Sequence, residues 1–381
     1  MLYCARCGLR YPVNIGVWRC ICQGELEYDN PHEIVVPDLN DLIPRPCSIW
    51  RYREALPALE DEYIITFNEG YTPIITIKYH DIPIWLKLDF LCPTGSYKDR
   101  GTSVMISCLK QTGIKSVVED SSGNAGASIA AYAGRAGMKC TVFVPSDTSP
   151  GKLIQIRAYG ATIEMVDGTR QDVAKACQEA AEGNHNGETF YASHNWNPFF
   201  LEGIKTLAYE IWEQGVRNSI MPNWVVIPAG YGSCVLGAYR GFSDLVNQGK
   251  LHEIPRLIVV QAKNCAPVYE AYLRGGTEVL PIHGQRTIAE GIACSNPVRG
   301  SEILHAVRAS GGVVMAVAEK EIECAAIELA KDGVFVEPTS AVVVAALKRL
   351  IDNEVISGND IALGILTGTG LKATDYYGSR L

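Results

Sequence analysis

The chain has 381 residues, of which 47% are hydrophobic and 20% are charged. This length exceeds the size at which one hydrophobic core stops growing, so it predicts two packed lobes and excludes a single small domain. The formal charge of −8, with Lys and Arg scattered along the chain, excludes a basic surface for nucleic acid or for an anionic membrane. Any anionic ligand must therefore be bound by local groups.

The N-terminal residues MLYCARCGLR lack the apolar region of a secretory signal. No uncharged apolar stretch reaches the roughly 18–20 residues that a membrane-spanning helix requires. The sequence therefore predicts a cytoplasmic protein with no membrane partner and no nucleic-acid partner.

The chain contains 13 Cys, an odd count that argues against a complete disulfide framework. Four of them, Cys4, Cys7, Cys20 and Cys22, form two close pairs that could supply four thiolates to a structural zinc ion. We therefore predict a zinc-ribbon-like module over residues 1–30. Two alternatives stay open, namely a motif that persists without metal and a set of free, reduced thiols. The other nine cysteines are predicted to be small buried hydrophobes.

From about residue 60, short β-branched runs alternate with amphipathic helical stretches, as in KSVVED, GNAGASIAAYAGRAG and CTVFVP. The alternation resumes at WVVIP and continues to IALGILTG. This βαβ pattern predicts an α/β fold with two open, mostly parallel sheets that carry helices on both faces. We assign residues 31–90 and 205–381 to a large lobe and residues 91–204 to a small inserted α/β lobe.

The segment PTGSYKDRG follows the predicted strand IWLKLDF and precedes a helix expected to begin near Thr102. It places Lys98 at a helix N-terminus, where the positive end of the helix dipole favours the neutral, nucleophilic amine. A lysine that forms a Schiff base needs that neutral form.

Three further loops lie at junctions that follow predicted strands, where open sheets bind ligands. SSGNAG, residues 121–126, offers small residues and the amide of Asn124. AGYGSC, residues 229–234, can surround a phosphate with backbone N–H groups and the Ser233 hydroxyl, and it lacks the pattern of a nucleoside-triphosphate loop. TGTGLK, residues 367–372, begins with Thr367, whose hydroxyl can hydrogen-bond a neutral ring nitrogen.

Taken in order, EGYTP, PTGSYKDRG, SSGNAG, PAGYGS and TGTGLK resemble the fold-type-II pyridoxal-phosphate enzymes, and specifically the threonine synthases. The N-terminal cysteines, KLIQIRAYGA and NWNPFFLEGIKT are also similar to that family. The sequence departs from the family pattern at Cys92, Tyr97 and Thr369, and in the run TIAEGIACSNPVRG.

The resemblance implies a tryptophan-synthase-β-like fold, a homodimer and pyridoxal 5′-phosphate as cofactor. It implies that Lys98 is the catalytic Schiff-base lysine and that Asn124 bonds the 3′ oxygen of the cofactor. Thr367 would face the ring nitrogen. The phosphate of the cofactor would be lined by Gly230, Tyr231, Gly232, Ser233 and Cys234.

The implied reaction is that of a lyase that converts O-phospho-L-homoserine and water to L-threonine and phosphate. The candidates to bind the small phosphorylated amino-acid substrate are Ser96, Ser122, Lys87, Arg157 and Lys205. One rival is β-elimination or β-replacement on phosphoserine or another amino acid, with His194 among the residues that would decide the substrate. Two other rivals are a non-catalytic metabolite sensor and a zinc-ribbon nucleic-acid binder.

Overall fold

The computed structural model describes residues 1–13, 16–183 and 188–380. The chain divides into two compact units: unit 1 comprises Met1–Glu69 and Lys98–Ile204, and unit 2 comprises Gly70–Tyr97 and Lys205–Leu381. This division differs from the predicted lobes because it places residues 31–69 in unit 1 and residues 91–97 in unit 2. In the described ranges, no helix combines the length and the apolar character needed to cross a membrane.

The main sheet of unit 1 is wholly parallel and has the strand order β8-β7-β6-β9. Its strands are β6 (Ser116–Glu119), β7 (Lys139–Pro145), β8 (Thr162–Val166) and β9 (Thr189–Tyr191). Its helices are α2 (Lys98–Gln111), α3 (Asn124–Ala136), α4 (Pro150–Ala158) and α5 (Arg170–Glu182). Since β6 leads to β7 and β8 on one side while β9 returns to its other side, the strand order reverses between β6 and β9. Ligands of open α/β sheets bind at such switch points.

The N-terminal cysteine module belongs to unit 1 and is a small antiparallel sheet in the order β2-β1-β3. Its strands are β1 (Leu2–Cys4), β2 (Arg10–Tyr11) and β3 (Leu26–Tyr28). The ring of Trp18 packs edge-on against Tyr191 and Trp196, with centroid distances of 4.7 and 5.4 Å. The module is therefore packed into unit 1, and the short helical segments α1 (Leu39–Leu42), η2 (Ile49–Ala55) and η3 (Asp61–Tyr63) follow it.

Unit 2 contains a six-stranded sheet in the order β12-β11-β10-β13-β5-β4, parallel except for the edge pair β4–β5. Its strands are β4 (Ile74–Tyr79), β5 (Ile82–Lys87), β10 (Trp224–Pro228), β11 (Arg256–Ala262), β12 (Val313–Val317) and β13 (Ala362–Ile365). Its longer helices are α7 (Ser233–Asn247), α8 (Pro267–Leu273), α9 (Gly300–Ala309), α10 (Glu319–Lys331) and α11 (Pro338–Asp352). The short ones are η4 (Asp89–Leu91), η5 (Glu290–Ile292), η6 (Gly370–Lys372) and α12 (Thr374–Gly378), and α6 (Pro198–Asn218) carries the chain from unit 1 into unit 2.

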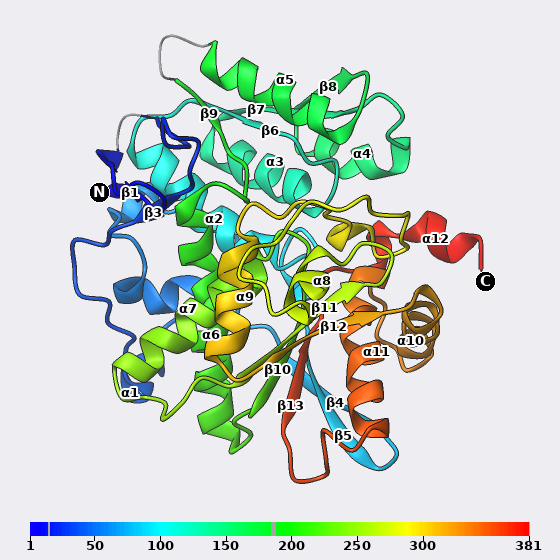
Figure 1. Ribbon diagram of the computed structural model, residues 1–381. Coiled ribbons are helices and arrows are strands. Elements are labelled where there is room, and N and C mark those ends of the chain that lie inside the picture. Colours follow the sequence, from blue (N-terminus) through cyan, green and yellow to red (C-terminus); the bar gives the residue numbers. More distant parts are fainter. Residues whose placement is uncertain (14–15, 184–187, 381) are drawn as a thin grey trace. The chain divides into compact units, whose positions relative to one another are not determined.

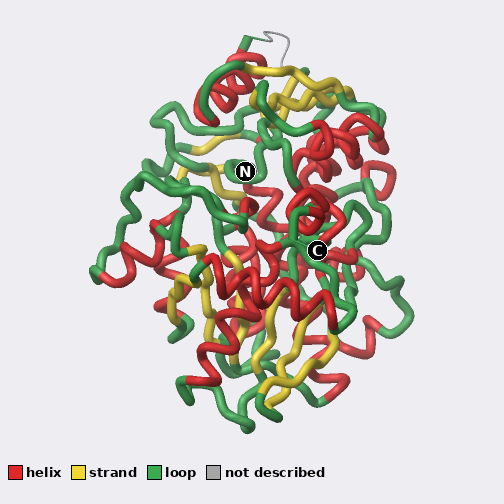
Figure 2. Tube along the Cα trace, turned by 90° about the vertical axis from the view of Figure 1, so that its right-hand side faces the viewer, coloured by secondary structure: helices red, strands yellow, loops and turns green. Residues whose placement is uncertain are grey.

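Helices cover both faces of the unit 2 sheet, with α7 and α9 on one side and α10 and α11 on the other (Figure 1). The strands of this sheet run side by side with helices flanking them in the turned view of Figure 2. Every residue of β10 and β13 is buried, as expected for parallel strands covered on both faces. The prediction of an α/β fold with open, mostly parallel sheets is confirmed.

Candidate active site

Three loops of unit 2 meet at the switch point of its sheet, where the strand order reverses between β10 and β13. The first loop, residues 229–232, follows β10 and leads into the 15-residue helix α7. Gly232 has φ +87°, and a Cβ there would lie 2.2 Å from Ile303 Cδ1, so glycine is required. In the described ranges the amides of Gly230 and Gly232 donate no hydrogen bond. Free amides at the start of a helix suit a phosphate.

The second loop begins at Thr367, directly after β13. Thr367 is buried, and its Oγ1 lies 3.2 Å from the Ser340 Oγ. The Ser340 Oγ accepts hydrogen bonds from the backbone N–H groups of Thr367 and Gly368, at 3.0 and 2.8 Å. Ser340 lies in the first turn of α11, within a run that reads only as an apolar helix, so the sequence offered no signal for its role.

The third loop follows β5 and ends at Tyr97. Ser96 pairs with Gly368, and the Tyr97 backbone N–H donates to the Thr367 carbonyl at 3.0 Å. The Tyr97 hydroxyl lies 3.0 Å from the Ser233 Oγ. Tyr97 therefore connects the loop after β13 to the loop after β10.

Two side chains of this third loop have unusual surroundings. Burial raises the pKa of Tyr97 far above its ordinary value, so its phenol is neutral over the working pH range. The Ser96 Oγ is fully buried and has no hydrogen-bond partner among the described residues, as expected of a group that faces a ligand.

Lys98, the residue that follows Tyr97 in the chain, belongs to unit 1. Lys98 is the first residue of α2, so the helix begins four residues before the predicted start near Thr102. Its Nζ lies 5.6 Å from the centre of the Phe200 ring, and the Phe200 side chain is fully buried. The Ser128 Oγ on α3 donates to Asp99 Oδ1 at 2.7 Å and holds the start of α2 against α3.

The SSGNAG loop of unit 1 lies between β6 and α3, and Asn124 is the first residue of α3. A Cβ at Gly126 would lie 1.9 Å from the Ser121 carbonyl oxygen, so the loop can close this tightly only around glycine. Ser122 and Asn124 are half-buried, which leaves part of each side chain accessible.

The remaining predicted substrate residues have different surroundings. Lys87 is fully buried, and its Nζ donates to Glu210 Oε1 and the Thr72 carbonyl at 2.5 Å and to Gln214 Oε1 at 2.9 Å. Lys205 is buried 3.1 Å from Asp244. We therefore propose structural roles for these two lysines. Arg157 lies exposed on α4.

Glu119 is a candidate site residue that the sequence analysis missed, because the run KSVVED reads as an ordinary buried strand. It is the last residue of β6 and is fully buried, with one carboxylate oxygen 3.6 Å from the Nδ1 of His194. His194 follows β9, the neighbouring strand at the switch point of the unit 1 sheet.

The four N-terminal cysteines converge as the zinc prediction requires. Their sulfur atoms all lie within 4.8 Å of one another, with Cys4–Cys22 and Cys7–Cys20 both at 3.5 Å. A zinc ion with bonds of about 2.3 Å would hold its sulfurs about 3.8 Å apart, so the set fits a closed structural site. Tyr11 donates a hydrogen bond to the Cys20 sulfur at 3.1 Å, the kind of outer contact that orients a ligand.

The other nine cysteines form no disulfide among the described residues, and seven of them are buried as predicted. The prediction was wrong for Cys47 and Cys324, which are exposed. Cys324 lies on an outer position of the amphipathic helix α10, which its sequence neighbours did not reveal.

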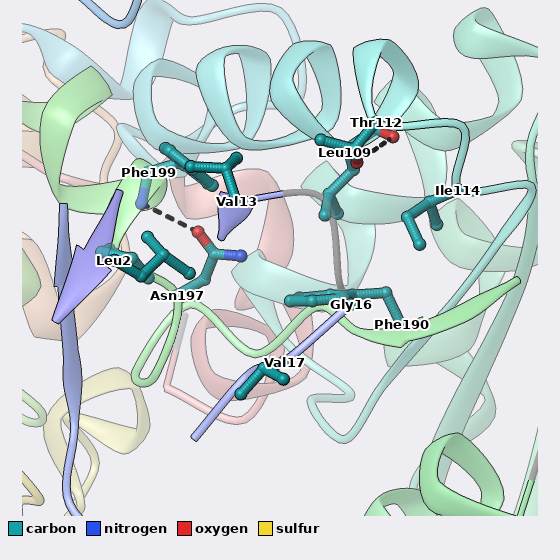
Figure 3. Close-up of a pocket in the computed structure, with 11 residues that line it drawn as sticks. Leu2, Val13, Gly16, Val17, Leu109, Thr112, Ile114, Phe190, Asn197 and Phe199 are labelled. Carbon is teal, nitrogen blue, oxygen red and sulfur yellow. Dashed lines mark hydrogen bonds between the residues drawn. The ribbon is translucent and has the colours of Figure 1, made fainter. Parts of the chain in front are cut away.

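A small cavity in unit 1 is not a candidate site. It measures about 10 Å³ and is lined mainly by apolar side chains of the N-terminal module, α2 and β9, as Figure 3 shows. Its polar side chains are Asn197, whose Oδ1 accepts from the Phe199 backbone N–H at 2.9 Å, and Thr112, whose hydroxyl donates to the Leu109 carbonyl at 2.9 Å. This volume is about that needed for one water molecule, so we attribute the cavity to imperfect packing.

Comparisons with known proteins agree with this interpretation of the loops. A family model described as "Pyridoxal-phosphate dependent enzyme" matches residues 65–368. This range contains the loops described above except the end of the TGTGLK motif, and it excludes the cysteine module. The match gives the class of protein, an enzyme that depends on pyridoxal phosphate.

Curated relatives give the particular family. The chain is 33% identical to the threonine synthase of Methanocaldococcus jannaschii, over 98% of this chain and 93% of the relative. It is 35% identical to the threonine synthase of Synechocystis sp., over 91% of this chain and 90% of the relative. The chain belongs to the threonine synthase family, and the threonine synthases are lyases.

Solved structures show the same fold at lower identity. The processed form of threonine deaminase isoform 2 from Solanum lycopersicum matches with a TM-score of 0.70 and 18% identity, over 92% of this chain and 92% of the other. Maize serine racemase matches with a TM-score of 0.68 and 20% identity, over 81% and 91% of the two chains. These likenesses support the fold alone.

The residues present fit pyridoxal phosphate. The free amides at Gly230 and Gly232 suit its phosphate, and the Thr367 hydroxyl is a neutral partner for its ring nitrogen. The buried Ser96 hydroxyl offers a further polar contact. Lys98 would supply the amine that such enzymes require.

Proposed function

We propose that this protein converts O-phospho-L-homoserine and water to L-threonine and phosphate, with Lys98 as the lysine that bonds the cofactor. One observation carries the proposal: Tyr97 hydrogen-bonds both to Thr367 and to Ser233. Lys98 is the next residue, and consecutive Cα atoms are about 3.8 Å apart. Lys98 is therefore joined covalently to the residue that contacts both loops, and this connection supports its role.

Each remaining role is assigned by the chemistry of the group. The backbone amides of Gly230, Tyr231, Gly232, Ser233 and Cys234 would hold the phosphate of the cofactor. Thr367 would bond the ring nitrogen, and Asn124 the 3′ oxygen. When bound, pyridoxal phosphate supplies an electron sink for negative charge that develops next to the substrate amino group.

The Lys98 amine would remove the proton from the substrate Cα as a general base. Loss of a second proton at Cβ would accompany departure of phosphate from Cγ. A proton would then add at Cγ to form the methyl group, water would add at Cβ, and return of a proton to Cα would give L-threonine. The hydroxyls of Ser96 and Ser122 are our candidates to orient the substrate, and Arg157 is the candidate cation for its phosphate.

The second candidate is elimination or replacement at Cβ of phosphoserine or another amino acid. It keeps Lys98 and changes only the substrate-binding groups. The observation that favours it is His194, a buried imidazole that senses the charge of Lys98 and is kept neutral by burial, so it offers no cation for a substrate phosphate.

The test compares the full-length wild type with Lys98→Ala, and uses Lys110→Ala on the same helix as the matched control. The wild type and the control should show a visible band near ~410–430 nm, and Lys98→Ala should lose it. Phosphate and threonine released from O-phosphohomoserine alone would support the proposal. Turnover of O-phosphoserine instead would favour the second candidate, and a wild type without the band after addition of pyridoxal phosphate would contradict both.

We also propose that the protein is a cytoplasmic homodimer, as the resemblance implies. Light scattering coupled to size-exclusion chromatography tests the dimer, since a mass of one chain at micromolar concentration would contradict it.

A further inference from the structure

A buried acid and a buried imidazole face each other at the switch point of the unit 1 sheet. Glu119 ends β6, and His194 follows the neighbouring strand β9 by three residues. The Ala192 backbone N–H donates to the Val118 carbonyl at 2.8 Å, which extends the pairing of the two strands toward this point. Loops at such a position bind ligands in open α/β sheets.

The two side chains are in contact but do not form an ordinary ion pair. Their side chains are 0% and 8% exposed, and His194 Nδ1 lies 3.6 Å from Glu119 Oε1. Neither carboxylate oxygen of Glu119 has a hydrogen-bond partner within the described residues. An ionised carboxylate in such surroundings is strongly disfavoured.

Electrostatics point the same way for both groups. Burial raises the pKa of Glu119 well above its usual range, and the negative charge of Asp120 adds to this effect. Burial lowers the pKa of His194 well below its usual value, and the positive charges of Lys98 and Arg170 add to it. Both shifts favour the uncharged form of each group, a protonated acid beside a neutral imidazole.

Lys98 is near enough to sense this proton. Its Nζ lies 5.6 Å from the centre of the Phe200 ring, and the His194 ring lies 5.6 Å from the same ring. A Cβ at Gly101 would lie 2.7 Å from Phe200, so the start of α2 is pressed against this aromatic side chain. The positive charge of Lys98 favours loss of a proton from both His194 and Glu119. By linkage, loss of charge at Lys98 makes both groups bind a proton more tightly.

We propose that His194 and Glu119 are positioning residues that hold a proton beside Lys98 and release or recover it as the charge on the Lys98 nitrogen changes. The inference rests on the proposed role of Lys98 and is independent of which amino acid is the substrate.

Few other groups around the pair titrate between pH 6 and 10. Arg170 stays charged, and its guanidinium pairs with Asp120 at 2.8 Å. Burial raises the pKa of Cys140 to about 12. Burial also raises the pKa of Cys177 and of Tyr191 beyond the range of the experiment. A midpoint of the cofactor band measured there reports on the proton at Lys98 as the neighbouring pair influences it.

The test is a pH titration of the visible cofactor band in the full-length holoenzymes of the wild type and of Glu119→Gln and His194→Gln. An ionised Glu119 helps to retain the proton at Lys98 on the alkaline side, so Glu119→Gln should lower the midpoint by about one pH unit. His194→Gln removes an imidazole whose protonation would oppose a positive charge at Lys98, so its midpoint should not fall below that of the wild type. The conservative variant Glu119→Asp should restore most of the wild-type midpoint.

Glu69→Gln is the matched control, because Glu69 is a buried acid of the same unit that accepts from the Tyr132 hydroxyl at 2.7 Å. Its midpoint should equal that of the wild type. A second measurement needs no variant: ¹⁵N spectra of histidine-labelled holoenzyme should show a His194 shift with the same midpoint as the band.

The outcomes separate this inference from the proposed function. Equal midpoints in the wild type and both Gln variants, or a His194 signal insensitive to the band transition, would overturn the inference alone. A band that persists in Lys98→Ala would overturn the proposed role of Lys98 and the inference with it.

Discussion

At the residue scale, Ser340 supports the loop that carries Thr367. One oxygen accepts two buried backbone N–H groups, so Ser340→Ala leaves both without a partner. Each such loss costs about 1–3 kcal/mol. We expect Ser340→Ala to lower the free energy of unfolding by about 2–4 kcal/mol and to weaken cofactor binding at least several-fold, as measured by urea denaturation and by titration of pyridoxal phosphate into the apoprotein.

Ser243→Ala is the control for that substitution, because the Ser243 hydroxyl donates only to a carbonyl of its own helix. It should change the free energy of unfolding by less than about 0.5 kcal/mol. Equal effects of the two substitutions would show that Ser340 has no special role.

The residues of the candidate site differ in how far the sequence could predict them. Lys98 lies in a string with strong family specificity, so its position could be stated from the sequence. Ser340 and Glu119 lie inside a helix and a strand whose patterns are fully explained by burial, so no local signal distinguished them. The burial of Lys87 beside Glu210 depends on a residue 123 positions away, which the sequence order does not show.

At the element scale, the contact between α2 and α6 depends on glycine. A Cβ at Gly203 on α6 would lie 2.2 Å from the Arg100 carbonyl oxygen on α2, and backbone atoms cannot move aside cheaply. We expect Gly203→Ala to destabilise the protein by about 2–4 kcal/mol in thermal or urea unfolding.

Gly215 on the same helix provides the comparison, because its nearest neighbour is the flexible end of the Met221 side chain at 3.0 Å. Gly215→Ala should be neutral or stabilise the protein by up to about 1 kcal/mol through helix propensity. A Gly203→Ala variant as stable as Gly215→Ala would mean that the helices can move apart freely.

The turn before β13 is fixed by one carboxylate. Asp360 accepts hydrogen bonds from Asn223 Nδ2 at 2.7 Å, from Trp224 Nε1 at 3.1 Å and from Ser357. Although partial burial opposes ionisation, these hydrogen bonds prevail and lower the pKa of Asp360 to about 2. The turn is thereby joined to β10, the strand beside β13.

This depressed pKa predicts a pH dependence of stability. The unfolded pKa of an Asp is about 3.9, so the stabilisation is complete above about pH 5 and is lost as the pH falls toward 2. Because Asp360 is partly exposed, we expect a contribution of only about 1 kcal/mol. The difference in urea stability between the wild type and Asp360→Asn should shrink from about pH 6 to about pH 2.5, and a constant difference would contradict the assignment.

The alternation of apolar runs with amphipathic stretches predicted which segments form strands and which form helices. Most of the predicted segments match a strand or a helix of the structure. The start of α2 was misplaced because the hydrophilic residues Lys98, Asp99 and Arg100 read as a loop. In the structure Asp99 and Arg100 are fully buried, so tertiary packing extends the helix through them.

At the scale of the whole molecule, the division into units depends on contacts between distant segments. Residues 31–69 precede β4 in the chain, yet the Ile65 backbone N–H bonds to Ser107 on α2, at 2.8 Å. Trp50 likewise donates to Ser103 at 3.0 Å. These contacts tie the segment to unit 1, and composition alone offers no sign of them.

The cysteine module raises the last prediction, which concerns the stability of all of unit 1. Two contacts join it to the rest of the unit. The Trp18 ring packs against the Tyr191 ring, and the Arg19 guanidinium lies 2.7 Å from the Glu182 carboxylate. If zinc holds the module, the full-length protein should contain about one zinc per chain. Its removal by chelation, or Cys20→Ser, should lower the free energy of unfolding by about 3 kcal/mol or more, because metal binding and folding are coupled.

Hydrogen exchange should then rise in β9 of unit 1 while β11 of unit 2 stays protected. Cys47→Ser, at an exposed thiol outside the module, should alter neither the zinc content nor the exchange. The opposite result would be a wild type that is purified under reducing conditions without zinc and whose melting temperature does not respond to chelator. It would favour free thiols packed by the surrounding aromatic rings.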